Sequence, residues 1–106
     1  MNKYVIVKEK DNRIVMRYAN TDYHKGMVGK NETCIGGGMF DFDDDGKEMK
    51  LWGKSDDFGA PDFAKIKGKI HADEDLAGTR IVLGNIYPSL EEHTKDITDK
   101  FIFDEW

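Results

Sequence analysis

The chain has 106 residues, with 21 acidic and 16 basic side chains and a formal net charge of −5. Its length suits a single domain over residues 1–106, which buries roughly two-thirds of its unfolded surface. The acidic balance argues against nucleic acid or an anionic membrane as a partner, because both reward a basic surface. One cysteine excludes an internal disulfide, and no apolar run matches a signal peptide or a membrane span. We therefore expect a cytoplasmic monomer.

The N-terminal stretch predicts a β-hairpin. Tyr4–Val7 and Ile14–Tyr18 are rich in β-branched and aromatic residues, and Asp11-Asn12 supplies a turn between them. A polar loop follows, and it carries Tyr23-His24 among several glycines. That loop is too interrupted by glycine to predict a helix.

The central stretch, Cys34–Gly59, predicts a second hairpin around which the rest of the chain is organised. Phe40 and Phe42 alternate with aspartates, which is the period of a half-buried strand. Asp45-Gly46 tolerates a tight turn with positive φ, and a return strand follows around Leu51.

The next segment predicts a helix over about residues 61–70. Pro61 and Asp62 are good first-turn residues, and Phe63, Ile66 and Ile70 share one helical face. Gly68 weakens the end of this helix.

A further strand, Thr79–Leu83, is predicted before a C-terminal helix. Ser89 and Glu92 form a capping box, and the apolar residues after it keep helical spacing to Phe101. Residues 101–106 end this helix or return as an edge strand. Together these elements predict an α/β (α+β) fold, a mixed sheet of about five to six strands flanked by two helices.

Three apparent ligand motifs fail on inspection. Asp41–Gly46 imitates the start of an EF-hand loop, but the twelfth position, which needs glutamate, is Trp52. Gly53-Lys54-Ser55 resembles the end of a P-loop, but the upstream glycine position is Glu48. Gly36-Gly37-Gly38 lacks the third glycine of a dinucleotide fingerprint, so close backbone packing or a bulge is the expected reason for it.

The histidines and the cysteine show no metal-ligand spacing, so neither a metal nor a cofactor is expected. Cys34 has no basic partner near it in sequence and reads as a small buried hydrophobe. His24 lies in a loop just after a strand, where catalytic groups concentrate, but spacing alone assigns no role and a structural role is the default for a lone histidine.

Several stretches in this order resemble the protein phosphohistidine phosphatase (janus/ocnus) family. The resemblance covers about residues 2–70, with a weaker match near Thr79–Asn85. The matching stretches are Lys3-Tyr4-Val5-Ile6, Ile14-Val15 with Tyr18, Tyr23-His24, Cys34-Ile35-Gly36-Gly37-Gly38 and Trp52-Gly53-Lys54-Ser55-Asp56-Asp57-Phe58-Gly59.

The resemblance implies a mixed sheet flanked by helices and metal-free hydrolysis of phosphohistidine or another phosphoramidate, carried by a protein or a small molecule. His24 would be the general base, because imidazole titrates near neutral pH. Lys3 would neutralise phosphate charge. Around them, phosphate oxygens would meet Ser55 and the N–H groups of Asp57 and Lys25. The candidate binding set is completed by Arg17, Asp56 and Gly59.

Three departures from the family pattern keep a second function open. The segment after His24 is short, so a helix behind the histidine is missing. The arginine expected in the second strand aligns with Met16, and Arg17, one residue on, would face the other side unless the register shifts. Asp56 and Asp57 repel a phosphoryl group. The alternative is a non-catalytic binding or regulatory module of the same fold, whose acidic loop recognises a cationic ligand or a basic protein surface.

Overall fold

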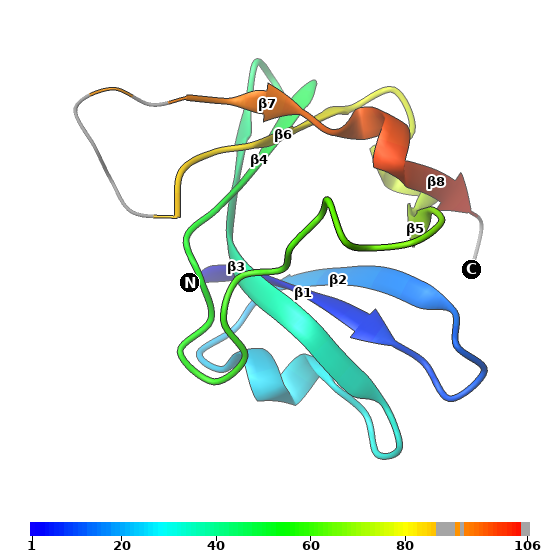
Figure 1. Cartoon of the computed structure of the whole chain (residues 1–106). Helices are drawn as coiled ribbons and strands as arrows, with labels where there is room; N and C mark the ends of the chain where they lie inside the picture. The colour runs from blue at the N-terminus through cyan, green and yellow to red at the C-terminus, as the bar shows by residue number, and fades with distance from the viewer. Residues whose placement is uncertain (87–90, 92, 105–106) are drawn as a thin grey trace.

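The computed structural model describes residues 1–86, 91 and 93–104, and its main feature is one curled, eight-stranded sheet (Figure 1). The strand order is β7-β6-β4-β3-β1-β2-β5-β8. The strands are β1 (Asn2–Lys8), β2 (Ile14–Asn20), β3 (Thr33–Asp43), β4 (Glu48–Trp52), β5 (Ile70–Asp73), β6 (Arg80–Leu83), β7 (Lys95–Asp96) and β8 (Phe101–Asp104). The described helices are three 3₁₀ turns, η1 (His24–Met27), η2 (Glu74–Leu76) and η3 (Thr98–Lys100). Within the described residues, no helix is long and apolar enough to cross a membrane.

Both predicted hairpins are present. β1 pairs with β2 in antiparallel register around a turn in which Asn12 adopts a φ of 70°. β3 pairs with β4 so that Phe40 faces Leu51 and Phe42 faces Met49. The β3–β4 turn ends at Gly46, whose φ of 83° and hydrogen bond to Asp43 reverse the chain.

Parallel strands extend the sheet on both sides of these hairpins. β6 runs parallel to β4, and β5 runs parallel to β2, with His71 paired to Val15. β8 then runs parallel to β5. The predicted α/β (α+β) fold, a sheet of five to six strands flanked by two helices, is therefore wrong: the sheet is mixed, but it has eight strands and no α-helix flanks it within the described residues.

The C-terminal segment bridges the two edges of the curled sheet. β7 pairs with β6 at one edge, whereas β8 pairs with β5 at the other (Figure 1). Between them, the Ile97 N–H donates to Ile81 O at 2.9 Å, and the Ile81 N–H donates to Thr98 Oγ1 at 2.9 Å. These bonds tie the segment to β6 before it crosses to β5, so the sheet curls around a single core.

The main core lies on the inner face of this curl. Its fully buried members come from nearly every strand and include Tyr4, Ile6, Met49, Leu51, Ile70, Ile81 and Ile97. The segment between β4 and β5 adds Phe63, which is 4% exposed and packs against Phe101 of β8 with ring centroids 6.5 Å apart. The irregular segment thus contributes a buried aromatic ring to the core beside β8.

The predicted helix at 61–70 is wrong. Residues 61–69 form turns and an irregular crossing segment, and Ile70 already begins β5. Asp62 closes a single turn, accepting from the Lys65 N–H, and Gly68 then takes a φ of 80°. Phe63 and Ile66 have helical spacing because both side chains of the crossing segment pack against the same core.

The second predicted helix is also wrong where the structure describes it. Residues 93–104 contain β7, η3 and β8 and no α-helix, and the strand alternative for residues 101–106 is confirmed for Phe101–Asp104. Ile97 and Phe101 are buried as predicted, but from a strand–turn–strand path. The capping box of Ser89 and Glu92 lies outside the described residues. Edge-strand hydrogen bonds thus outweigh the local helical pattern.

Replacing Phe63 with alanine tests whether the crossing segment holds the core. We expect Phe63→Ala to lower the free energy of unfolding by about 3–5 kcal/mol, because the buried ring leaves a cavity. Phe42→Ala is the matched control, since Phe42 is 45% exposed and mainly contacts Phe40 and Tyr18. That control should lose only about 0.5–1.5 kcal/mol. Urea denaturation of both variants measures the two losses. Equal losses of unfolding free energy would contradict the role of the Phe63 ring in the core.

Candidate functional site

The outer face of β1–β3 carries the residues that the sequence singled out. Cross-strand pairs share a face, and Val5 is paired with Arg17 while Lys3 is paired with Ala19. Tyr4, between them in sequence, points into the core on the opposite face. η1 lies beside this outer face together with the loop that follows β4 (Figure 1).

His24 begins η1 and is packed against the sheet. Its side chain is 5% exposed, and Nε2 lies 2.7 Å from the carbonyl oxygen of Gly38. A β-carbon on Gly37 would stand 3.1 Å from His24 Cδ2, so the imidazole rests directly over a glycine. Because a carbonyl only accepts, Nε2 carries the proton of this bond, and in the neutral ring Nδ1 is the nitrogen with a lone pair.

The loop 55–59 is attached to the same glycine. The Gly37 N–H donates to Gly59 O at 2.9 Å, and the Ser55 N–H donates to Gly37 O at 2.9 Å. The loop is closed on itself by a bond from the Gly59 N–H to Ser55 O, and Gly59 has a φ of 72°. Gly37 therefore contacts the histidine through its open face and holds the loop through its main chain.

Ser55 is buried and has a structural contact inside this loop. Its side-chain oxygen accepts from the Phe58 N–H at 3.2 Å. Asp56 and Asp57 are exposed at the tip, and their N–H groups donate to no partner among the described residues. The Lys25 N–H is likewise without a partner in that part of the chain. The loop tip and the start of η1 thus offer main-chain donors next to His24, as anion-binding nests do.

Lys3 brings a positive charge to this place. Its ammonium donates to the carbonyl oxygen of Asp22 at 2.8 Å, two residues before His24. No carboxylate in the described residues pairs with it. An ammonium that is bound to a carbonyl and to no carboxylate among the described residues keeps a net charge to offer an anion.

Arg17 lies on the outer face of the sheet with the other candidate site residues, but its guanidinium is already paired with two glutamates. We expected it to face away, and the register places it beside Val5, while Met16 is buried in the core. Its guanidinium holds Glu32 through two hydrogen bonds of 2.6 and 2.7 Å and also contacts Glu9 and the Met27 carbonyl. Arg17 therefore fastens the end of η1 and the loop after it, and does not stand free as a phosphate ligand.

Comparison with known proteins now identifies the family. The profile of the Janus/Ocnus family matches residues 2–77, about seven-tenths of the chain. The chain belongs to the Janus/Ocnus family. No curated protein and no solved structure is significantly similar to it. The matched range contains Lys3, His24 and the whole 55–59 loop, and it ends before β6.

The sequence of this Janus/Ocnus protein did not single out the other residues of the site. Gly37 and Gly38 stood out only as a triple glycine, which signalled close packing but not the group that approaches. Glu32 carried no signal, because its partner lies 15 positions away in another strand. The described residues hold no group of three histidine, cysteine, aspartate or glutamate side chains arranged to bind a metal.

Adding a methyl group at Gly37 tests whether this glycine seats His24. A β-carbon there would lie 2.5 Å from the Tyr4 carbonyl oxygen as well as against the histidine, so Gly37→Ala should cost about 1–3 kcal/mol and displace the ring. Gly36→Ala is the matched control, because its β-carbon meets Pro61 N at 2.5 Å instead and the carbonyl that binds His24 belongs to Gly38. Both should be destabilised. Only Gly37→Ala should shift the NMR signals of the His24 ring strongly, and equal shifts would refute the seating.

The Arg17–Glu32 pair predicts a pH dependence of stability. The hydrogen bonds from Arg17 are the main cause that lowers the pKa of Glu32 from 4.5 to about 2. A lowered folded-state pKa stabilises above the unfolded value, so the contribution is complete above pH 4.5 and is lost as the pH falls towards 2. Glu32→Gln should remove this part of the acid destabilisation, whereas Glu9→Gln should leave most of it. Thermal unfolding between these pH values measures both, and identical profiles for wild type and Glu32→Gln would contradict the pairing.

Proposed function

We propose that this Janus/Ocnus protein hydrolyses phosphohistidine or a related phosphoramidate without a metal, with His24 as the general base. The observation that carries the proposal is the double attachment at Gly37. One glycine seats the imidazole and also anchors the 55–59 loop, whose tip amides are free of partners among the described residues. A base and an anion cradle therefore share one fixed point of the sheet.

The hydrogen bond of the ring leaves one nitrogen available as a base. Nε2 is engaged by the Gly38 carbonyl, which selects the tautomer whose Nδ1 carries the lone pair. Nδ1 has no hydrogen-bond partner among the described residues. In the proposed step, Nδ1 takes a proton from water while the water oxygen bonds to phosphorus. The P–N bond breaks, and the leaving nitrogen takes a proton from solvent.

The charges of the site decide whether a phosphoryl group is tolerated. Asp56 and Asp57 are repulsive, but both side chains are exposed, where a unit charge at 4 Å costs only about 1 kcal/mol in water. Lys3 contributes an attraction of the same order. The main-chain donors of the loop then add hydrogen bonds to phosphate oxygens, which charge makes stronger than neutral ones. Binding is therefore weak in the ground state but feasible.

The binding-module alternative rests on the same two aspartates. Their exposed carboxylates form no ion pair within the described residues, so they are open to a cationic ligand or a basic protein surface. In that case the cradle amides would stay solvated and no phosphate would be released. Mutating the aspartates separates the two functions. Asp56→Asn with Asp57→Asn should strengthen phosphate binding but abolish binding of a cation.

Phosphate release from phosphohistidine and phospholysine tests the proposed activity. His24→Gln is the sharpest variant, because the glutamine amide can still donate to Gly38 O while no second nitrogen remains to act as base. We expect it to lower kcat/KM by about 10²–10⁴-fold, the usual contribution of general base catalysis. His93→Gln, at an exposed histidine, is the matched control and should be unchanged.

A phosphate titration followed by NMR tests the cradle without turnover. The amide signals of Lys25 and of residues 56–58 should shift, and Lys3→Met should weaken the binding. Shifts without hydrolysis would leave an anion-binding site and remove the enzymatic proposal. Neither shifts nor hydrolysis would favour the binding module.

A further inference from the structure

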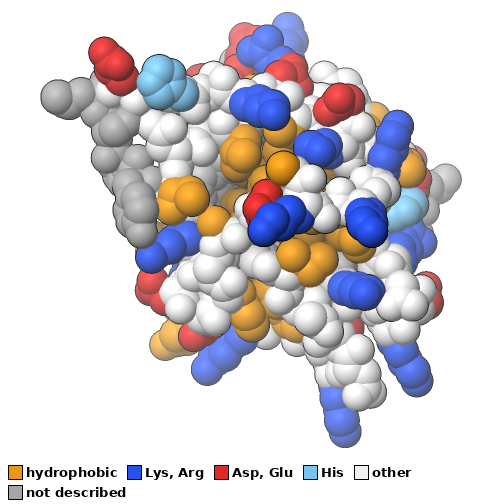
Figure 2. All heavy atoms as spheres, in the orientation of Figure 1, with side chains coloured by type: hydrophobic (Ala, Val, Ile, Leu, Met, Phe, Trp, Pro, Cys, Tyr) orange, Lys and Arg blue, Asp and Glu red, His pale blue; other side chains and the backbone are white. Residues whose placement is uncertain are grey.

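A face of the molecule away from His24 combines an apolar groove with a rim of lysines. Figure 2 shows hydrophobic side chains in the middle of this face with basic side chains around them. The chain has five more acidic than basic residues, so a cluster of positively charged side chains on one face requires an explanation. Surface charges of one sign focus the binding of the opposite sign.

The groove consists of two hollows on either side of the crossing segment. One, of about 420 Å³, is lined by apolar residues of that segment together with Leu83, Ile86 and Ile97. The other, of about 470 Å³, is lined by Ile14, Ile35 and Ile66. Ala60 and Asp62 line both, so the two hollows adjoin. Each has room for an apolar side chain of a ligand.

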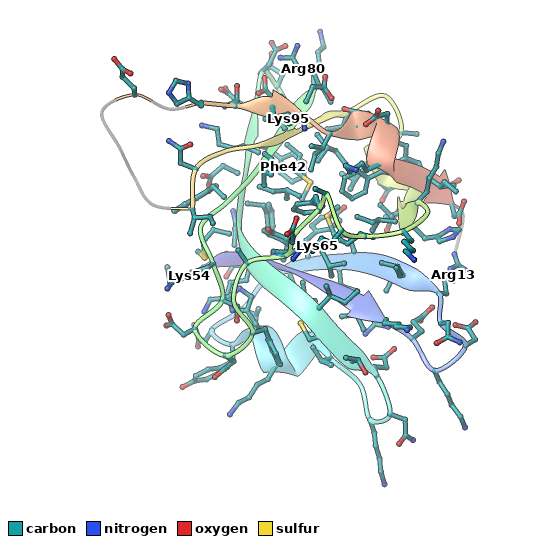
Figure 3. The ribbon with its side chains drawn as sticks, in the orientation of Figure 1. Arg13, Phe42, Lys54, Lys65, Arg80 and Lys95 are labelled. Carbon is teal, nitrogen blue, oxygen red and sulfur yellow. The ribbon has the colours of Figure 1, made fainter. Side chains whose placement is uncertain are left out.

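The rim is positively charged. The lysines that line the two hollows come from four separate segments and are Lys8, Lys65, Lys67, Lys95 and Lys100. The acidic residue that lines them is Asp62, and it lies 3.9 Å from Lys65 in a loose, exposed pair. Figure 3 shows Lys65 on the crossing segment and Lys95 on β7.

We propose that this groove binds an acidic segment of a partner protein that carries apolar side chains. Two adjoining hollows fit two apolar side chains of an extended or helical peptide. The lysine rim fits carboxylates between or beside those side chains, which steers association and sets orientation more than it adds affinity. The proposal is independent of the phosphatase proposal, because no groove residue belongs to the His24 site.

Two other occupants fit the observations less well. A membrane surface rewards apolar side chains that project, and here the apolar residues line recesses. A second copy of the chain offers an acidic turn at Asp41–Asp45, but Phe42 beside it packs on Phe40 and Tyr18 and is not free to enter a hollow. A contact of that kind would also be head-to-tail and would not close.

Binding of short labelled peptides by fluorescence anisotropy tests the proposal. The probe has leucines alternating with glutamates and aspartates; one comparison peptide has glutamines in place of the acids, and another has serines in place of the leucines. Only the first should bind measurably, and its affinity should fall as salt rises. NMR shifts should fall on residues 60–66, 83–86 and 95–100. Ile86→Ser, at a residue 48% exposed, should weaken binding without loss of folding.

Charge reversal with a matched control decides between the groove and general attraction. The double variant Lys65→Glu with Lys95→Glu should raise the Kd by about tenfold. Lys10→Glu with Lys30→Glu changes the net charge equally at a hollow elsewhere on the surface and should leave the Kd unchanged. An equal rise of the Kd in both double variants overturns the proposal. So does binding to vesicles containing phosphatidylserine without binding to the peptide, or self-association that Lys65→Glu with Lys95→Glu abolishes.

Discussion

The structure depends on the absence of side chains at Gly36–Gly38 in β3. Other parts of the chain pack within contact distance of the main chain of these glycines. A side chain at the first would meet Pro61 N at 2.5 Å, at the second the His24 ring at 3.1 Å, and at the third Trp52 O at 2.4 Å. The crossing segment, the candidate base and the end of β4 all converge there because no side chain prevents it.

A bulge directly before these glycines bends the sheet. Ile6 pairs with Gly36 and Val7 with Cys34, so Ile35 is the extra residue in β3, and a bulge of this kind bends its strand. A bent β3 allows β4, β6 and β7 to turn back over the core, while β5 and β8 close in from the other side (Figure 1). Segment 97–100 can then join β7 to β8, because the two edges have been brought near each other. The architecture is thus a consequence of bending and not of helices packed on a flat sheet.

Local patterns predicted the first half of the chain well and the second half poorly. Hairpins such as β3–β4 are encoded by neighbouring residues, so alternation and a turn at Gly46 suffice to find them. β5 and β8 are short parallel strands paired with distant residues, and nothing local distinguishes Ile70 or Phe101 from the apolar stripe of a helix. The site behaved likewise. His24 was singled out by its loop and by the family resemblance, and its catalytic role stays a prediction, whereas Glu32 became visible only when the fold brought it to Arg17.

The two proposed surfaces divide the molecule by charge and by origin. The His24 site lies wholly within residues 2–77, the range of the family match, and its loop tip is acidic. The groove is lined within that range by residues of the crossing segment and by Lys8, Ile14 and Ile35, and its rim is basic. Beyond that range it is lined by Leu83, Ile86, Lys95, Ile97 and Lys100. A partner that carries carboxylates is repelled by Asp56 and Asp57 and attracted by Lys65 and Lys95. If both proposals hold, electrostatics separates the proposed phosphorylated substrate, which would bind through main-chain donors, from the proposed acidic protein segment, which would bind at the positive rim. The C-terminal segment that closes the sheet also supplies Lys95 and Lys100, two of the five rim lysines, so the same short stretch of chain closes the sheet and contributes to the proposed partner site.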